Sequence, residues 1–189
     1  MLEELTFLEE GEYTKRDFSI KFIAKQIKNS DKNKTPLENI SNYLKRFEHL
    51  RTKPIEFRKR QGRDVLISGY YNGCTDICLA FLVVARALGI PARYVETFQE
   101  EWLNNPDDKR IVGHVFADVK IDGKWKVYEP LRGFTPGDQY VLEGEPYKEV
   151  GKGLDFSQVF IKEDGVYRPN PLNLQKLDEA VKIFKPSQK

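Results

Sequence analysis

An almost uncharged stretch in the middle of the chain is the feature that most constrains the fold. From Thr75 to Leu88 the sequence reads TDICLAFLVVARAL, in which Asp76 and Arg86 are the only charged residues. The stretch is long enough for about four helical turns, and Gly89 directly after it is a common helix stop signal. A helix that is apolar almost all round is buried almost all round. We therefore expect Cys74 to Leu88 to form the central helix of a globular fold.

The size and charge of the chain favour one globular domain. Its 189 residues are 40% hydrophobic and 32% charged, as in ordinary soluble domains. We expect a single domain over 1–189, made of a helical N-terminal part (1–60), a core (64–135) and a part that completes a sheet and adds a C-terminal helix (136–189). The 31 basic and 29 acidic side chains nearly cancel, which gives no support to a nucleic-acid partner.

Three features of the sequence indicate the cellular compartment of the protein: its first residues, its hydropathy and its cysteines. The segment Met1-Leu2-Glu3-Glu4-Leu5 is acidic and lacks the basic-then-apolar order of a signal peptide. No uncharged apolar run approaches the roughly 18 residues that a membrane-spanning helix needs. Cys74 and Cys78 lie four positions apart in the expected helix, where their side chains do not meet in disulfide geometry. We therefore expect a cytoplasmic protein with no membrane contact and two free thiols.

A local basic run, Arg58-Lys59-Arg60 with Arg63 nearby, could contact phosphate or an anionic surface. Runs of this kind are more often solvated connections rich in lysine and arginine. We favour that interpretation.

Two amphipathic helical patterns precede the central helix. Apolar residues recur at helical spacing in the first pattern, at Phe18, Phe22, Ile23 and Ile27. The second pattern opens at Thr35-Pro36-Leu37-Glu38, which combines a capping-box pair with proline at the first helical position. This helix should end near Thr52, because Pro54 disfavours a helical conformation in the residue before it.

The second half of the chain has the pattern of strands joined by turns and loops. Asp122-Gly123 between two β-rich runs is the strongest short-range signal of a hairpin. We therefore expect strands over Val112–Ile121 and Lys124–Tyr128. The other expected elements are a strand (Ala92–Phe98), a polar loop (Gln99–Arg110), a mostly irregular region (Pro130–Gly153), a short hairpin around Glu163–Gly165 and a final helix from about Asn173 to Phe184.

Cys74 is the first candidate for chemistry, because it follows Gly73 and stands at the first turn of the expected central helix. Free backbone N–H groups and the positive end of the helix dipole stabilise a thiolate at that place. The same N–H groups can hold an oxyanion once the sulfur attacks a carbonyl. Taken alone, a cysteine is more often a small buried hydrophobic residue, and that is our expectation for Cys78 one turn further on.

His114 is the second candidate, since it lies on the first strand of the expected hairpin. The Asp122-Gly123 turn pairs Phe116 with Glu129, so that His114 and Glu129 become diagonal neighbours on one face of the sheet. Their backbones then lie roughly 7–8 Å apart, within reach of an imidazole–carboxylate hydrogen bond. The alternative is a strand histidine and a surface glutamate with no joint role. The second histidine, His49, is expected on the exposed side of its helix.

Together, Cys74, His114 and Glu129 would supply a nucleophile, a general base and an orienting acid. The motifs around them resemble the transglutaminase-like superfamily of papain-like cysteine enzymes. The resemblance covers about Asp64 to Thr135. It rests on Gly73-Cys74-Thr75-Asp76, on ARALGIPARYV from Ala85 to Val95, on HVFADV from His114 to Val119, on Asp122-Gly123-Lys124-Trp125 and on Glu129-Pro130.

The resemblance implies an α+β fold, in which a central helix carrying Cys74 packs on an antiparallel sheet carrying His114 and Glu129, with extra N-terminal helices. In one respect the chain departs from the family, which usually has aspartate where this chain has Glu129. Glutamate can accept the same hydrogen bond, but its extra methylene requires a different approach to the ring.

The resemblance also implies a function: a cysteine-dependent hydrolase, a protease or amidase, acting on peptide or protein amide bonds through a thioester. Three alternatives stay open, namely a glutamine cross-linking transferase, a glycan-releasing amidase and a catalytically silent binding module. No Cys/His cluster and no phosphate-binding glycine motif is present, so neither a metal nor a cofactor is expected. The substrate and the oligomeric state are not indicated.

Several nearby residues have less defined roles. The residues Tyr70, Tyr71 and Asn72 precede the nucleophile, where a side chain could complete an oxyanion hole, and the sequence does not choose among them. We expect Asp76 to stabilise the helix start. We expect Trp125 to serve packing rather than substrate stacking.

Overall fold

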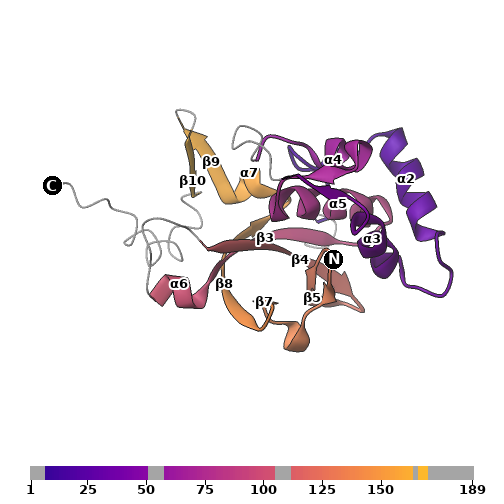
Figure 1. The fold of residues 1–189 in the computed structure, drawn as a ribbon. Helices are drawn as coiled ribbons and strands as arrows, with labels where there is room; N and C mark the ends of the chain where they lie inside the picture. Colours follow the sequence, from indigo (N-terminus) through magenta and orange to yellow (C-terminus); the bar gives the residue numbers. More distant parts are fainter. Residues whose placement is uncertain (1–6, 51–57, 105–111, 164–165, 170–189) are drawn as a thin grey trace.

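The structure is a computed structural model that describes residues 7–50, 58–104, 112–163 and 166–169. A layer of helices lies on one face of a six-stranded sheet with the strand order β6-β5-β4-β3-β8-β7 (Figure 1). All strand pairs of that sheet are antiparallel. The expected α+β class is confirmed.

The helices are mostly short, apart from two that exceed ten residues. Their bounds are α2 (Phe18–Lys28), α3 (Pro36–Leu44), α4 (Gly62–Ser68), α5 (Cys74–Ala87), α6 (Glu100–Asn104) and α7 (Phe156–Val159), with a 3-10 turn η2 at Pro136–Asp138.

The strands of the main sheet are β3 (Ala92–Gln99), β4 (Gly113–Ile121), β5 (Lys124–Glu129), β6 (Gly133–Phe134), β7 (Val141–Leu142) and β8 (Glu145–Gly153). Two further pairs stand apart: parallel β1 (Glu48–His49) with β2 (Tyr70–Tyr71), and antiparallel β9 (Phe160–Glu163) with β10 (Val166–Pro169). The second of these pairs confirms the expected hairpin near residue 164. The expected helix from Asn173 to Phe184 lies outside the described residues.

Helix α5 is the centre of the molecule, as its composition predicts. Every residue from Thr75 to Arg86 is buried. The helix packs against α2, α3 and α4 on one side and against β3 and β4 on the other, so that one hydrophobic core joins both layers (Figure 1). The body of this helix is therefore enclosed between the two layers.

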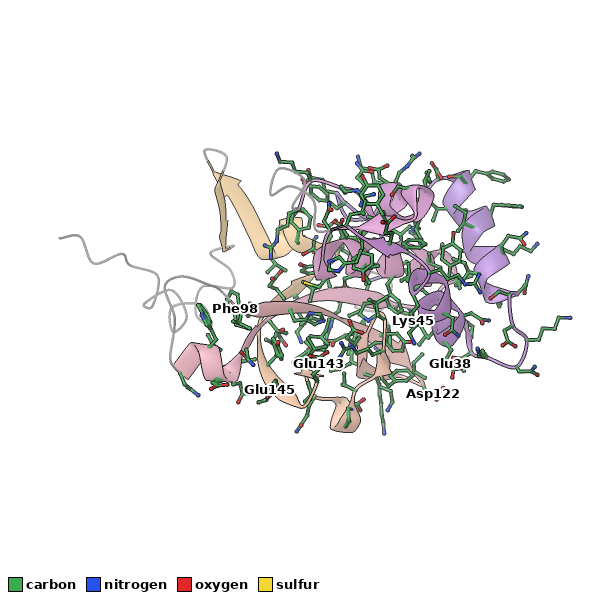
Figure 2. The ribbon with its side chains drawn as sticks, viewed as in Figure 1. Glu38, Lys45, Phe98, Asp122, Glu143 and Glu145 are labelled. Carbon is green, nitrogen blue, oxygen red and sulfur yellow. The ribbon has the colours of Figure 1, made fainter. Side chains whose placement is uncertain are left out.

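The hairpin of β4 and β5 also forms as predicted. Asp122 and Gly123 have φ angles of 50° and 76°, and positive φ at both central residues defines the type I′ turn that matches the twist of the strands. Asp122 lies at the outer end of the hairpin (Figure 2). Ile121 pairs with Lys124 and Ala117 with Tyr128, which is the predicted register.

The region after the hairpin differs from the prediction of a mostly irregular segment over Pro130–Gly153. It contains β8, a nine-residue strand that pairs with β3 along most of its length. Pro146, Gly151 and Gly153 lower the intrinsic strand preference of this segment, but pairing with an already formed neighbour outweighs it. The predicted polar loop after β3 begins instead with helix α6.

The first helix forms where expected, but only part of its predicted apolar pattern, Ile23 and Ile27, faces the core. Phe18 and Phe22 are 84% and 57% exposed, whereas Ile20, Ala24 and Ile27 are buried. The buried positions have helical spacing as well, and the small Ala24 allows α2 to approach its neighbours closely. Two sets of apolar positions overlap in this helix and share Ile27. Packing buries Ile20 and Ala24 in place of the larger Phe18 and Phe22.

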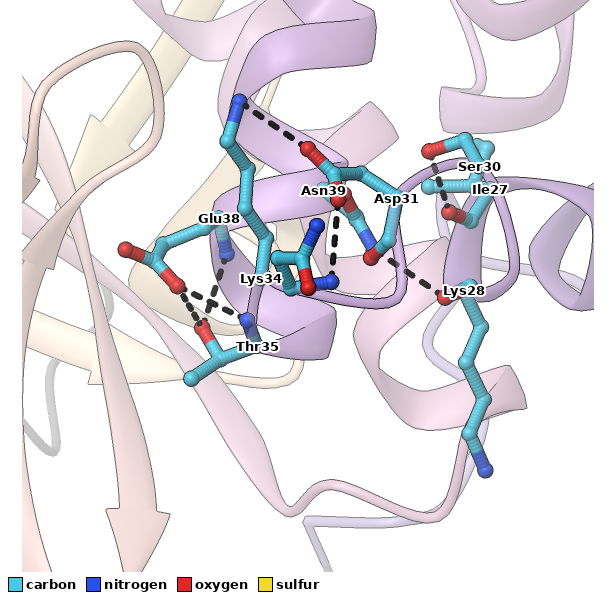
Figure 3. A network of polar contacts seen from close by, with 9 residues as sticks. Ile27, Lys28, Ser30, Asp31, Lys34, Thr35, Glu38 and Asn39 are labelled. Carbon is cyan, nitrogen blue, oxygen red and sulfur yellow. Dashed lines mark hydrogen bonds and ion pairs between the residues drawn. The ribbon is translucent and has the colours of Figure 1, made fainter.

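The second helix begins as predicted and ends early. The side-chain oxygen of Thr35 accepts the backbone N–H of Glu38, and Glu38 accepts the N–H of Thr35, which completes the capping box (Figure 3). Nearby, Asn39 donates to the carbonyls of Lys28 and Asp31 and so ties α3 to the end of α2. The helix ends at Leu44 rather than near residue 52, because the chain turns there to form β1.

The far end of α5 is fixed by one buried guanidinium. Arg86 donates to the carbonyl oxygens of Ala92 (2.9 Å) and Leu154 (2.7 Å) and to the hydroxyl of Thr14 (2.8 Å). Burial lowers the pKa of Arg86 to about 10, which still leaves the group charged at neutral pH. This side chain therefore joins the N-terminal segment, the central helix and the end of β8.

Candidate active site

Cys74 occupies the first position of α5, after the N-cap residue Gly73. Its thiol is free and half-buried, in agreement with the expected free cysteines. A Cβ added to Gly73 would meet no atom within 4 Å, so the space on that side of the helix start is open. The N-cap glycine has no side chain to cap the first-turn N–H groups, which are the groups suited to hold an oxyanion.

His114 lies near the start of β4 and contacts the other two candidate residues. Its Nε2 atom is 3.3 Å from Oε1 of Glu129, and Cys74 lies close enough to the ring to raise the pKa of the imidazole. The side chains of His114 and Glu129 are 14% and 7% exposed. The structure thus brings together the three residues that the sequence singles out, although the catalytic role of each is a further step.

Glu129 ends β5 and uses both carboxylate oxygens. Oε1 faces His114, while Oε2 accepts the backbone N–H of Leu131 at 2.9 Å. The second contact fixes the carboxylate plane, which accommodates the extra methylene relative to aspartate. The predicted same-face relation of His114 and Glu129 is therefore confirmed by a direct side-chain contact.

The protonation of His114 reflects opposing influences. Burial lowers the pKa of the imidazole, but hydrogen bonds to Cys74 and Glu129, together with their charges, outweigh burial and raise the pKa to about 9. The imidazole therefore holds its proton at neutral pH.

Aromatic rings support the imidazole from a second, smaller core on the outer face of the sheet. The ring of His114 meets Phe116 edge to face at 4.9 Å and Tyr147 at 6.1 Å between centroids. This core consists of Val95, Phe116 and Val127, with Tyr140, Leu142 and Tyr147 packed against it. Sequence reasoning missed Tyr147 because it lies on β8, a strand that the sequence did not predict.

The loop before Cys74 is held on both sides. Tyr71 stacks on the exposed His49 at 4.7 Å with nearly parallel rings. Burial, and next the charge of Glu129, raise the pKa of Tyr71. The N–H of Asn72 donates to Asp76 at 3.1 Å. His49 is exposed as predicted, but it belongs to a strand rather than a helix.

The remaining candidates near the site have structural contacts. Cys78 is fully buried, as predicted, and its thiol donates to the carbonyl of Phe116 at 3.4 Å. Burial raises the pKa of this thiol well above its usual range. Trp125 packs edge to face on Phe7 and lies under the guanidinium of Arg93, in line with the expected packing role.

The interpretation of the basic run as a solvated connection is wrong for two of its members. Arg58 forms a 2.7 Å ion pair with Glu96, and Arg60 forms a 3.1 Å ion pair with Asp76. Lys59 between them is exposed. Asp76 therefore does more than favour the helix start, because it is buried and binds both a guanidinium and the N–H of the preceding loop.

Within the described residues, no group of three or more His, Cys, Asp or Glu side chains is arranged to hold a metal ion. A search of the same residues for a helix long and apolar enough to cross a membrane found none.

The chain belongs to the transglutaminase-like superfamily, because the family model described by that name matches residues 21–130, more than half of its length. A solved structure described as a putative cysteine protease from Cytophaga hutchinsonii is similar in fold, with a TM-score of 0.56 and 19% sequence identity. The similarity covers 82% of this chain and 48% of that chain, so the present chain spans about half the length of that protein. A comparison with curated proteins found no match.

Proposed function

We propose that the protein is a cysteine-dependent hydrolase of amide bonds, with Cys74 as nucleophile, His114 as acid–base group and Glu129 as the orienting carboxylate. One observation carries the proposal: the imidazole of His114 is hydrogen-bonded to the Glu129 carboxylate, and Cys74 lies close enough to raise the pKa of the same imidazole. Membership in the transglutaminase-like superfamily, whose members are usually Cys-His-Asp enzymes, supports it.

The first half of the reaction starts from a protonated imidazole beside the sulfur. The thiolate forms a bond to the carbonyl carbon of the amide, and the carbonyl electron pair moves to oxygen. First-turn N–H groups of α5, beginning with that of Cys74, stabilise this oxyanion. When the carbon–nitrogen bond breaks, His114 gives its proton to the leaving amine, and a thioester with Cys74 remains.

The second half regenerates the enzyme. The neutral imidazole of His114 takes a proton from water, and the water oxygen attacks the thioester carbonyl. The carbon–sulfur bond breaks, the carboxylic acid product leaves, and the thiolate and the protonated imidazole are restored. An amine in place of water would give a cross-linking transferase on the same three residues.

Glu129 is proposed to orient His114 and to stabilise its charged form. Its 2.9 Å bond from the N–H of Leu131 holds the carboxylate in place, so that only Oε1 is directed at the imidazole. A catalytically silent binding module is the weaker candidate, because binding alone does not require all three residues in contact.

We also propose peptide or protein amides as substrates and a reducing compartment such as the cytoplasm as the place of action. A thiolate nucleophile is active only while it is reduced, and both cysteines are free.

Thiol reactivity tests the proposal without knowledge of the substrate. We expect iodoacetamide at neutral pH to alkylate Cys74 roughly tenfold faster than a model thiol or more, because the neighbouring imidazole favours the thiolate. His114→Ala should remove this advantage, while Arg63→Gln, in the surface ion pair with Asp17, should leave it intact. If Cys74 reacts like a model thiol and His114→Ala changes nothing, the enzyme proposal fails.

A panel of electrophilic probes then separates the alternatives. Peptide, glutamine and asparagine-glycan probes are compared on the wild type and on Cys74→Ser, which should abolish labelling by each. Preferential labelling by the peptide probe supports the hydrolase. Preferential labelling by the glycan probe, or transfer of the acyl group to an added amine in place of release to water, supports one of the alternatives.

A further inference from the structure

Two arginines, two positions apart in the chain, reach the two halves of the candidate active site. Arg58 binds Glu96 on β3, the strand next to the one that carries His114. Arg60 binds Asp76 in the first turn of α5, the turn that carries Cys74. The helix and the sheet are thus joined by one short segment at the level of the site.

Arg60 fixes the loop that leads to Cys74. One of its terminal nitrogens donates to the carbonyl of Tyr70 (2.9 Å) and to Asp76 (3.1 Å), while the other donates to the carbonyl of Asp64 and to the hydroxyl of Ser68. Its guanidinium also lies 4.0 Å from the ring centre of Tyr70. Because Asp76 also accepts the N–H of the residue before Gly73, Arg60 and Asp76 hold the loop at both of its ends.

Arg58 fixes the sheet side. Its guanidinium forms the 2.7 Å bond to Glu96 Oε1, and the other oxygen of Glu96 accepts the hydroxyl of Tyr94 at 2.6 Å. Glu96 immediately precedes Thr97, which pairs with His114 across the strands and donates its hydroxyl to the His114 carbonyl at 2.9 Å. Glu96, which binds Arg58, is therefore the direct neighbour in sequence of Thr97, the residue that pairs with His114.

Both ion pairs are shielded from water. The side chains of Arg58 and Glu96 are 11% and 5% exposed, and those of Arg60 and Asp76 are 10% and 3% exposed. Arg58 also adopts a φ angle of 55°, in the left-handed region that residues other than glycine rarely occupy. A strained backbone conformation of this kind persists where the surrounding contacts determine it, and such residues gather at functional sites.

Arg58 also interacts electrostatically with Cys74. Burial lowers the pKa of Arg58, but the nearby charges of Glu96, Tyr94 and Cys74 outweigh burial and raise it. The guanidinium therefore lies close enough to Cys74 for the two side chains to interact electrostatically.

We propose that Arg58 and Arg60, together the arginine clamp, are positioning residues that hold the Cys74 end of α5 against His114. The inference rests on the proposed function, since it assigns a role in the same site. If either ion pair is lost, the helix start and the His114 strand are no longer joined at this level, and the contact between Cys74 and His114 loosens.

The test uses the full chain and two measured quantities that do not change when only the stability of the fold changes. One is the rate of Cys74 alkylation by iodoacetamide at neutral pH. The other is the titration of the His114 imidazole by NMR, with His49→Gln as background so that one histidine remains. The variants are Arg58→Asn and Arg60→Gln, with Arg63→Gln as the matched control. Asparagine is chosen because it tolerates the left-handed conformation, and Arg63 pairs with Asp17 at the surface.

We expect each clamp variant to slow the alkylation of Cys74 roughly tenfold or more, because small displacements of reacting groups are costly. The pKa of His114 should fall from about 9 toward its ordinary value of 6.5, since the hydrogen bond to Cys74 contributes to the raised value. Arg63→Gln should change neither quantity. Circular dichroism confirms that each variant is folded.

Folded clamp variants with an unchanged alkylation rate and an unchanged His114 titration would overturn the inference. If the first variants do not fold, Arg58→Lys and Arg60→Lys replace them, because lysine keeps the charge but lacks the planar fork. The same two measurements then decide. A wild-type Cys74 that reacts like a model thiol refutes the proposed function itself, whereas a reactive wild type with unaffected variants refutes only the clamp.

Discussion

Four side chains surround the imidazole of His114: Glu129 at hydrogen-bonding distance, Cys74 near enough to affect its pKa, and the rings of Phe116 and Tyr147. The aromatic rings exclude water, which disfavours the charged imidazole. The two polar partners favour it. With a pKa of about 9, the partners prevail, so that the folded protein holds a proton that an unfolded chain would release near pH 6.5.

This difference predicts a dependence of stability on pH. Below about pH 6.5 both states hold the proton and the stabilisation is complete; between about 6.5 and 9 the folded state binds more protons, so the free energy of unfolding falls as the pH rises. The fall is measured by urea unfolding at a series of pH values in a Cys74→Ser background, because in the wild type the proton of the Cys74 thiol would also enter the balance.

Two variants assign this pH dependence to His114. In His114→Gln the fall between about pH 6.5 and 9 should disappear, and in Glu129→Gln it should be smaller, because the uncharged amide raises the imidazole pKa less than the carboxylate does. Equal slopes for Cys74→Ser with and without His114→Gln would contradict the prediction.

At the scale of elements, the two ends of α5 are secured by different means. The first turn is fixed by Asp76 and the clamp, whereas the last turn is fixed by Arg86, which reaches Thr14, Ala92 and Leu154. Asp155 lies near this guanidinium and accepts the N–H of Tyr13 at 2.7 Å. Two charged side chains therefore form hydrogen bonds with buried groups at this end of the helix, Arg86 as donor and Asp155 as acceptor.

Replacement of this arginine should weaken the whole fold. Arg86→Met fills a similar volume but removes three hydrogen bonds from buried acceptors, and we expect a loss of roughly 3 kcal/mol or more in the free energy of unfolding. Urea unfolding measures the change. Arg132→Met is the control, since Arg132 and its partner Glu143 are 51% and 71% exposed, and it should leave stability nearly unchanged. Equal effects of the two substitutions would refute the proposed role.

Some elements could be predicted from the sequence because their signals are local. An apolar run predicted α5, and the Asp122-Gly123 turn set the register that joins His114 to Glu129. The strand β8 was missed, because its stability comes from pairing with β3, distant in the sequence. The arginine clamp was missed for a similar reason. The carboxylates that pair with Arg58 and Arg60 come from β3 and α5, and the sequence of a basic run does not reveal these partners.

At the scale of the molecule, one core connects the helical layer to the sheet. Residues of α2, α3, α4 and α5 share it with residues of β3, β4, β5 and α7. We therefore propose that the described part of the chain is one domain, with the catalytic residues at the junction of its two layers.

A single domain should lose both layers in one transition. The helical layer dominates far-ultraviolet circular dichroism, whereas the fluorescence of two tryptophans reports on the sheet side: Trp102 on α6 packs on Phe98, and Trp125 lies on β5. Urea curves followed by the two signals should therefore coincide. Two separate midpoints would show that the helical layer and the sheet unfold independently.

The difference between the two cysteines has a practical consequence. Cys74 lies next to the open space beside Gly73, whereas Cys78 is fully buried. In an excess of thiol reagent, the thiol of Cys74 should thus react rapidly, and the thiol of Cys78 should react only when the protein unfolds. The rate of this slow reaction would report the rate of unfolding in native buffer, without denaturant. The reaction of Cys78 would therefore measure the kinetic stability of the protein directly.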